Sequence, residues 1–250
     1  MVLESLFTSN EIRRHPWDMF ILGLFVSSLG TWLAYYIFPN GSSSWSIFLT
    51  TLALAPLIHR VLVREEQEEF DIKEKSLFKR HADVISDYVF LFFGMLTSFT
   101  AWFLFVPDAV RAILFNNQLA LLTTTVDPSL ALLTNLKILS AFILIAFVFG
   151  AGAILLLAWD ASITAALIGS IIRKSYAGVS IGGVLLYEIP EIMGYSLGAI
   201  AGGMLSAAII RKHYKTKAFP HILLDVMIMI FFAVVLVVIS ALAKAYILGA

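Results

Sequence analysis

The 250-residue chain is 60% hydrophobic and 14% charged, and its mean hydropathy is +0.92. Soluble domains are about 45–50% apolar and about 25% charged, so the composition excludes an ordinary soluble protein. The formal net charge of zero argues against a nucleic-acid partner, and the lack of cysteine excludes disulfides and thiolate catalysis. We therefore expect an all-α, polytopic transmembrane helical bundle in the lipid bilayer of the cell membrane.

The first part of the sequence predicts an interfacial segment followed by a transmembrane hairpin. Residues 1–16 mix apolar and charged side chains, as in a short interfacial helix or a frayed terminus. Two apolar runs then predict crossings at about 17–38 and 45–63, joined by an uncharged turn. Residues 17–63 are thus read as one hairpin.

The segment 64–84 is the long hydrophilic stretch of the chain. Its first half is acidic and its second half is basic, an order that suits the dipole of a helix. It is either a solvated cytoplasmic connector or a docking helix for a cytoplasmic or membrane protein partner, and the sequence leaves both readings open.

Residues 85–250 predict the main bundle. Residues 107–134 alternate polar and apolar character, as expected of an extracytoplasmic amphipathic segment that lies on or dips into the membrane surface. Residues 160–172 are too short to span alone, which favours a half-helix packed among neighbours. The expected pieces are crossings at about 85–106 and 135–159, the half-helix 160–172, a long helix 184–210 broken at Pro190, and a last crossing at 221–248.

Lysine and arginine positions predict the orientation. The turn 39–44 carries neither residue type and 107–134 carries only Arg111, whereas 64–83 and 211–217 are rich in both. The rich segments should be cytoplasmic, together with the N-terminus. About seven membrane segments result, with the C-terminus extracytoplasmic, and a non-crossing 160–172 would place 211–217 on the wrong side.

Acidic residues within the apolar run 160–210 are the candidate site. Glu188 and Glu191 lie three apart, close to Tyr187, on the stretch that Pro190 interrupts. A carboxylate at bilayer depth costs at least about 2.5–3.5 kcal/mol, so it normally has a partner or a function. The group is either a polar site for a cation, a proton or a lipid headgroup, or a structural hydrogen-bond network.

Other polar residues have simpler interpretations. Asp160 is expected to be the N-cap of the half-helix, although it belongs to the candidate polar intramembrane group. His221 and Asp225 share a helix face and predict a pair, and Lys137 and Lys244 can snorkel from helix ends.

Gly194, Gly198 and Gly202 form a small-residue seam on the long helix. Such spacing lets another helix approach closely, either within the same bundle or across a homo-oligomer.

The sequence contains no nucleotide-binding loop, zinc motif or hydrolytic triad, and its five histidines lack ligand spacing. We therefore expect no metal, no cofactor and no enzymatic activity.

The second half of the chain resembles the stage II sporulation protein M family, which also occurs in archaea. The resemblance covers about residues 135–248, and the family's His-Gly-x-x-Glu motif has its counterpart at 187–191, with Glu191 in the place of the family glutamate. The chain differs at Tyr187-Glu188, which replace His-Gly, and at Asp160, which replaces asparagine. The residues that carry the match are Asn135-Leu136-Lys137, Gly150, Trp159-Asp160-Ala161, Ala165, Gly169 and Tyr187-Glu188-Ile189-Pro190-Glu191.

This resemblance implies a non-enzymatic membrane scaffold that recruits partner proteins. The family is also distantly similar to the permeases of type-two ATP-binding-cassette exporters. The alternative is therefore a transport protein, either an exporter permease subunit or a channel, that uses the intramembrane carboxylates at the broken helix.

Overall fold

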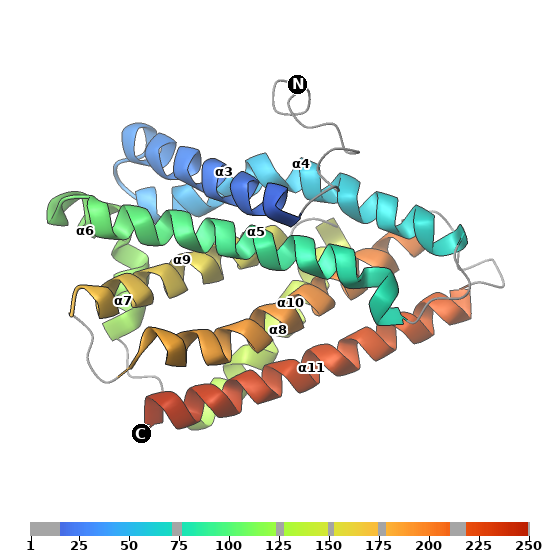
Figure 1. Ribbon diagram of the computed structural model, residues 1–250. Helices are drawn as coiled ribbons and strands as arrows, with labels where there is room; N and C mark the ends of the chain where they lie inside the picture. Colours follow the sequence, from blue (N-terminus) through green and yellow to red (C-terminus); the bar gives the residue numbers. More distant parts are fainter. Residues whose placement is uncertain are drawn as a thin grey trace.

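The structure, a computed structural model, describes residues 16–71, 77–123, 128–149, 153–174, 179–210 and 219–249. Every regular element in these ranges is an α-helix (Figure 1). The expected interfacial segment before Pro16 lies outside the described residues. The helices are α3 (Pro16–Ile37), α4 (Ser42–Asp71), α5 (Leu77–Phe105), α6 (Asp108–Leu114), α7 (Asn116–Thr123), α8 (Pro128–Phe149), α9 (Ala153–Ile172), α10 (Ile181–Ile210) and α11 (Phe219–Gly249).

Six helices of the described chain are long and apolar enough to cross a membrane: α3, α5, α8, α9, α10 and α11. Helix α4 carries the acidic residues of the hydrophilic stretch in its second half. Large apolar side chains are exposed at every fourth position of α3, from Trp17 through Ile21 and Phe25 to Leu29. A continuous exposed apolar stripe suits contact with lipid, and the chain has the helices of a multi-pass membrane protein.

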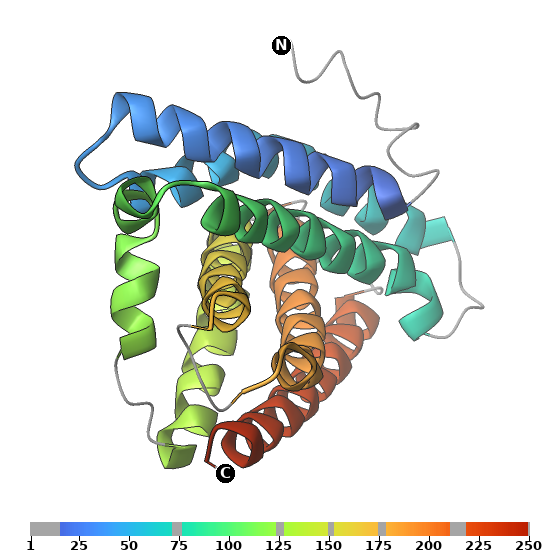
Figure 2. The same ribbon diagram turned by 60° about the vertical axis from the view of Figure 1, so that its left-hand side comes forward.

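Helices α3, α4 and α5 form one layer of the molecule (Figure 2). Helices α3 and α5 run in the same direction, because Trp17 stacks edge-on against Phe90 near one end and Trp32 against Trp102 near the other. Gly94 makes this close approach possible, since a Cβ atom there would collide with the backbone carbonyl of Phe20.

The second group, α8, α10 and α11, is organised around α10, and α9 lies between this group and the layer formed by α3, α4 and α5. Gly198 contacts Leu139 and Gly202 contacts the Ile143 backbone, which shows that α8 and α10 are parallel. Gly194 packs against Val237 of α11, and the order of contacts makes α10 and α11 antiparallel. The three glycines of the seam therefore face helices of the same chain, α11 for the first and α8 for the other two.

Two expected boundaries are wrong. Helix α8 ends at Phe149 and α9 begins at Ala153, so the expected crossing 135–159 and half-helix 160–172 are replaced by two full-length helices. The sequence signal for a boundary between two helices here was the pair Gly150 and Gly152, because glycine is a poor helix former. The expected break at Pro190 is also wrong, since Pro190 lies inside α10, which is one helix of 30 residues.

The amphipathic segment 107–134 resolves into α6, α7 and the first turns of α8, which begins at Pro128 rather than Asn135. Helices α6 and α7 cover the end of the bundle at which α11 finishes (Figure 1). The hydrophilic stretch 64–84 is largely helical, because α4 continues to Asp71 and α5 begins at Leu77.

Candidate functional site: a carboxyl cluster between three helices

Glu188 lies inside the bundle, with 3% of its surface exposed. It is seven residues from the start of α10 at Ile181, which is about 10 Å along the helix axis. The hydroxyl of Thr164, on the neighbouring helix α9, donates a hydrogen bond of 2.8 Å to Oε1 of Glu188. One acceptor atom of this buried carboxyl is thus satisfied by a different helix.

Glu191, one turn further along α10, is 2% exposed. Its Oε1 accepts a 2.8 Å hydrogen bond from the Tyr195 hydroxyl, and its Oε2 accepts a 2.6 Å hydrogen bond from the Ser240 hydroxyl of α11. The two glutamates therefore connect α10 to two different helices, Glu188 to α9 and Glu191 to α11. The donors are all hydroxyl groups, which can also accept a hydrogen bond.

Asp160 lies one turn before Thr164 on α9 and interacts electrostatically with both Glu188 and Glu191. It is in the interior of α9, seven residues after Ala153, so the expected N-cap role is wrong. Its Oδ2 atom is enclosed by protein and has no hydrogen-bond partner among the described residues. We call Asp160, Glu188 and Glu191 the carboxyl cluster.

Lys244 of α11 is the cation of this site. It lies one turn beyond Ser240, and its Nζ atom is 5.1 Å from the ring centroid of Tyr187. The ammonium also interacts electrostatically with all three acids of the carboxyl cluster. The sequence suggested only a snorkelling lysine, because the pairing of α10 with α11 is what places Lys244 beside Tyr187. Lys137, the other expected snorkelling lysine, is exposed on α8.

The charges of the site would not balance if all three carboxyl groups were ionised. Three ionised carboxylates and one ammonium give −3 + 1 = −2 in a region enclosed by apolar helices. Uncompensated charge is very costly in such surroundings. The cluster is therefore suited to holding protons or admitting a further cation.

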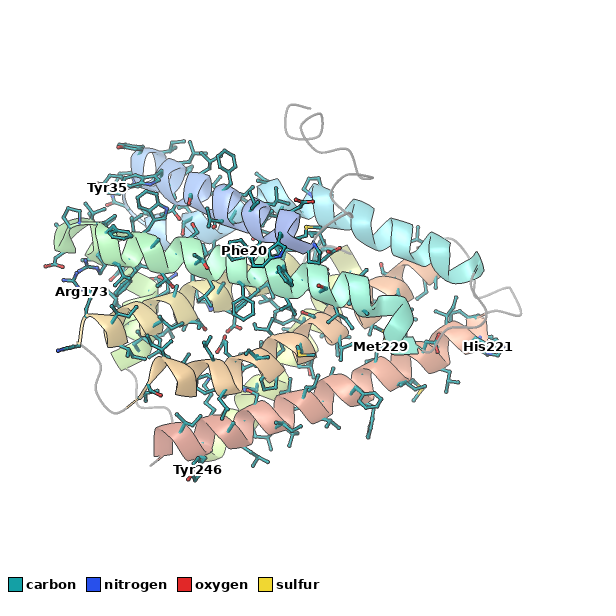
Figure 3. The ribbon with its side chains drawn as sticks, in the orientation of Figure 1. Phe20, Tyr35, Arg173, His221, Met229 and Tyr246 are labelled. Atoms are coloured by element: carbon teal, nitrogen blue, oxygen red, sulfur yellow. The ribbon has the colours of Figure 1, made fainter. Side chains whose placement is uncertain are left out.

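The geometry of the described residues supports a metal site less than it supports a site for protons or an ammonium group. Among the described residues, no group of three histidine, cysteine, aspartate or glutamate side chains could hold a metal ion. His221, at the other end of α11 from Tyr246 (Figure 3), is exposed and far along the helix from Lys244. The expected pair of His221 and Asp225 stays a prediction.

A second polar connection, missed in the sequence, joins α4, α7 and α9. Gln118 is 1% exposed; its Oε1 accepts a 2.5 Å hydrogen bond from Ser43 and its Nε2 donates a 3.0 Å hydrogen bond to Ser162. Ser162 lies between Asp160 and Thr164 in sequence, so α7 is attached to the helix that carries part of the carboxyl cluster. No sequence motif signals this contact, which depends on how α7 turns into the bundle.

The same end of the molecule carries an arginine latch. Arg111 is buried and donates to the backbone carbonyls of Phe103 and Val106 and to the Asp108 carboxylate. Asp108 also accepts a 3.0 Å hydrogen bond from Arg173, which follows α9 (Figure 3). The Arg111 hydrogen bond, followed by the charges of Arg111 and Arg173, lowers the pKa of the exposed Asp108 carboxyl.

Comparison with known proteins finds no relative of this chain. No protein-family model matches the chain, and neither a curated protein nor a solved structure matches it.

Proposed function

We propose that this chain is a multi-pass membrane transport protein whose carboxyl cluster binds a cation on its way across the bilayer. The observation that carries the proposal is the burial of Glu188 and Glu191, each tied by a hydroxyl to a different helix, beside the enclosed and unpartnered Oδ2 of Asp160. Acidic residues at this depth mark ion pathways in membrane proteins. The function needs no enzymatic step and no cofactor.

The proposed topology has seven crossings, with the N-terminus cytoplasmic and the C-terminus extracytoplasmic. Helix directions support it: α3, α5, α9 and α11 run one way, whereas α4, α8 and α10 run the other way. The lysines and arginines of 211–217 then lie on the cytoplasmic side. Glu188 lies toward the extracytoplasmic end of α10 in this topology, because it is close to the start of that helix.

The test is charge movement in proteoliposomes adsorbed on a solid-supported membrane. Concentration jumps of sodium, methylammonium or protons should displace charge in the wild-type protein. Glu188→Gln and Glu191→Gln should reduce the displaced charge at least tenfold, because each removes a carboxylate while keeping an acceptor oxygen for Thr164 or Ser240. Each variant must elute as a single species to show that it is folded.

Asp108→Asn is the matched control. It makes the same carboxyl-to-amide change on an exposed residue outside the cluster, and it should leave the displaced charge unchanged. If no cation jump gives a signal with the wild type, or if both glutamine variants respond normally, the transport function is overturned.

The second candidate is a membrane scaffold of the stage II sporulation protein M type, which recruits partners through residues 64–83. Its support is the helical character of this charged stretch, since α4 continues to Asp71 and α5 begins at Leu77. A scaffold would tolerate Glu191→Gln and would lose a co-purifying partner when 64–83 is deleted. If the chain is a transporter, Glu191→Gln should instead strongly reduce the displaced charge.

A further inference from the structure

The Lys244 ammonium already occupies a position that stabilises a cation, over the ring of Tyr187, and we call this position the seat. The ammonium lies 5.1 Å from the centroid of the Tyr187 ring and interacts with Asp160, Glu188 and Glu191. An ammonium over an aromatic face is attracted by the negative charge density of that face. The chain itself thus shows what this part of the bundle binds: a primary ammonium with an aromatic ring on one side and carboxyl groups nearby.

The Lys244 side chain can also adopt a second conformation, in which it extends toward the end of α11. Lys244 is five residues before the end of α11 at Gly249, which is about 7.5 Å along the axis. Lysines near the ends of membrane helices extend their four-carbon stems so that the ammonium reaches the polar interface. The Lys244 ammonium can therefore leave the seat without moving α11.

The acids remain when the lysine leaves. Glu191 stays bound to Ser240 and Tyr195, and Glu188 stays bound to Thr164, through contacts that do not involve Lys244. The vacated seat would then present the face of Tyr187, with the three acids of the carboxyl cluster near enough to interact electrostatically with a cation there.

We propose that Lys244 is the tethered resident cation of the carboxyl cluster, and that the transported cation is a small organic ammonium ion that takes its seat. The inference rests on the transport function proposed above and names its substrate class. An ammonium ion suits the site better than a metal ion, because a ring face binds ammonium well and the described residues form no metal-ligating group.

The experiment uses methylammonium as the probe, with the full-length protein in proteoliposomes on a solid-supported membrane. Lys244→Met removes the competing ammonium and keeps a long apolar side chain. The methylammonium concentration that gives half-maximal charge displacement should fall about tenfold, the ratio expected for loss of a modest competing interaction. Lys244→Arg keeps a tethered cation and should stay near the wild-type value.

Tyr187 gives an independent arm that does not depend on the stability of the lysine variants. Tyr187→Phe keeps the ring face and should preserve the response to methylammonium. Tyr187→Leu removes the face, and the half-maximal concentration should rise several-fold. Elution as a single species is required of all four variants.

The outcomes separate this inference from the transport function. Signals from sodium or protons but not from methylammonium would overturn the ammonium assignment and leave transport standing. An unchanged half-maximal concentration in Lys244→Met, or a folded Lys244→Met that no longer responds, would overturn the role of Lys244 as a competitor. If no cation at all displaces charge, both proposals fail together.

Discussion

At the residue scale, the informative side chains are those that an apolar bundle should not contain. Glu188 and Glu191 are almost fully buried, yet each finds a hydroxyl partner on another helix. Such partners reduce the cost of burying a polar group without neutralising its charge. The three acids and Lys244 therefore form the site at which we propose cation binding, and its hydrogen bonds join α10 to α9 and α11.

Asp108 shows the opposite situation, an exposed acid held by two arginines. Because its pKa is lowered in the folded protein, the carboxylate contributes stability above the ordinary aspartate pKa, and this contribution is lost as the pH falls through the lowered value. We expect the melting temperature of the wild type to exceed that of Asp108→Asn at neutral pH, and the difference to vanish in acid. Thermal unfolding in detergent across this pH range measures it; a difference that grows in acid would contradict the latch.

At the element scale, glycines decide how closely the helices approach. A methyl group at Gly94 would meet the Phe20 carbonyl, and one at Gly202 would meet the Ile143 carbonyl. Backbone atoms cannot move aside as a flexible side chain can. These two positions therefore fix the α3–α5 and α8–α10 contacts, while Gly198 meets only side-chain atoms of Leu139 and Ile143.

Alanine substitutions test this distinction. Gly94→Ala and Gly202→Ala should each lower the free energy of unfolding by roughly 1–3 kcal/mol, the usual cost of overpacking. Gly182→Ala is the matched control, because the nearest atom to its added methyl group is the Ser180 hydroxyl at 4.0 Å. Unfolding titrations in mixed detergent compare the three. Equal effects at Gly94 and Gly182 would mean that close packing does not limit the α3–α5 contact.

At the scale of the whole molecule, the main question is whether α4 crosses the membrane. It lies antiparallel to α3, and its residue Ser43 reaches Gln118 at the covered end of the bundle. If α4 spans the membrane, the turn at Asn40 and the segment at Ser180 lie on the same side of the membrane. If α4 does not span it, these two positions lie on opposite sides of the membrane.

The absence of cysteine makes this easy to measure. Single cysteines introduced as Asn40→Cys, Ser180→Cys and Lys215→Cys can be labelled with an impermeant maleimide in right-side-out vesicles. We expect labelling at positions 40 and 180 and protection at position 215 until the membrane is opened. Labelling at 40 together with protection at 180 would exclude the seven-crossing arrangement.

The sequence by itself determined the broad class of the protein, a helical chain with membrane-spanning segments, and it singled out two acids that the structure shows to be buried. A chain with 60% hydrophobic residues can span lipid only as helices or closed barrels. Its long apolar runs predicted the helices now seen as α3, α5 and α11. Glu188 and Glu191 were identifiable because ionisable residues are rare in such segments. This information is local, and local patterns are what a sequence displays directly.

Only the tertiary structure decided what surrounds these acids. Lys244 lies 53 residues after Glu191 and Thr164 lies 24 residues before Glu188, so no spacing rule connects them. Their proximity follows from the packing of α10 against α9 and α11; the Gly194 contact fixes the α10–α11 pair, and the Thr164–Glu188 hydrogen bond joins α9 to α10. Likewise, Asp160 became an interior residue of α9 because the helix begins at Ala153. Side chains meet through packing between helices, and that packing depends on contacts over the whole bundle.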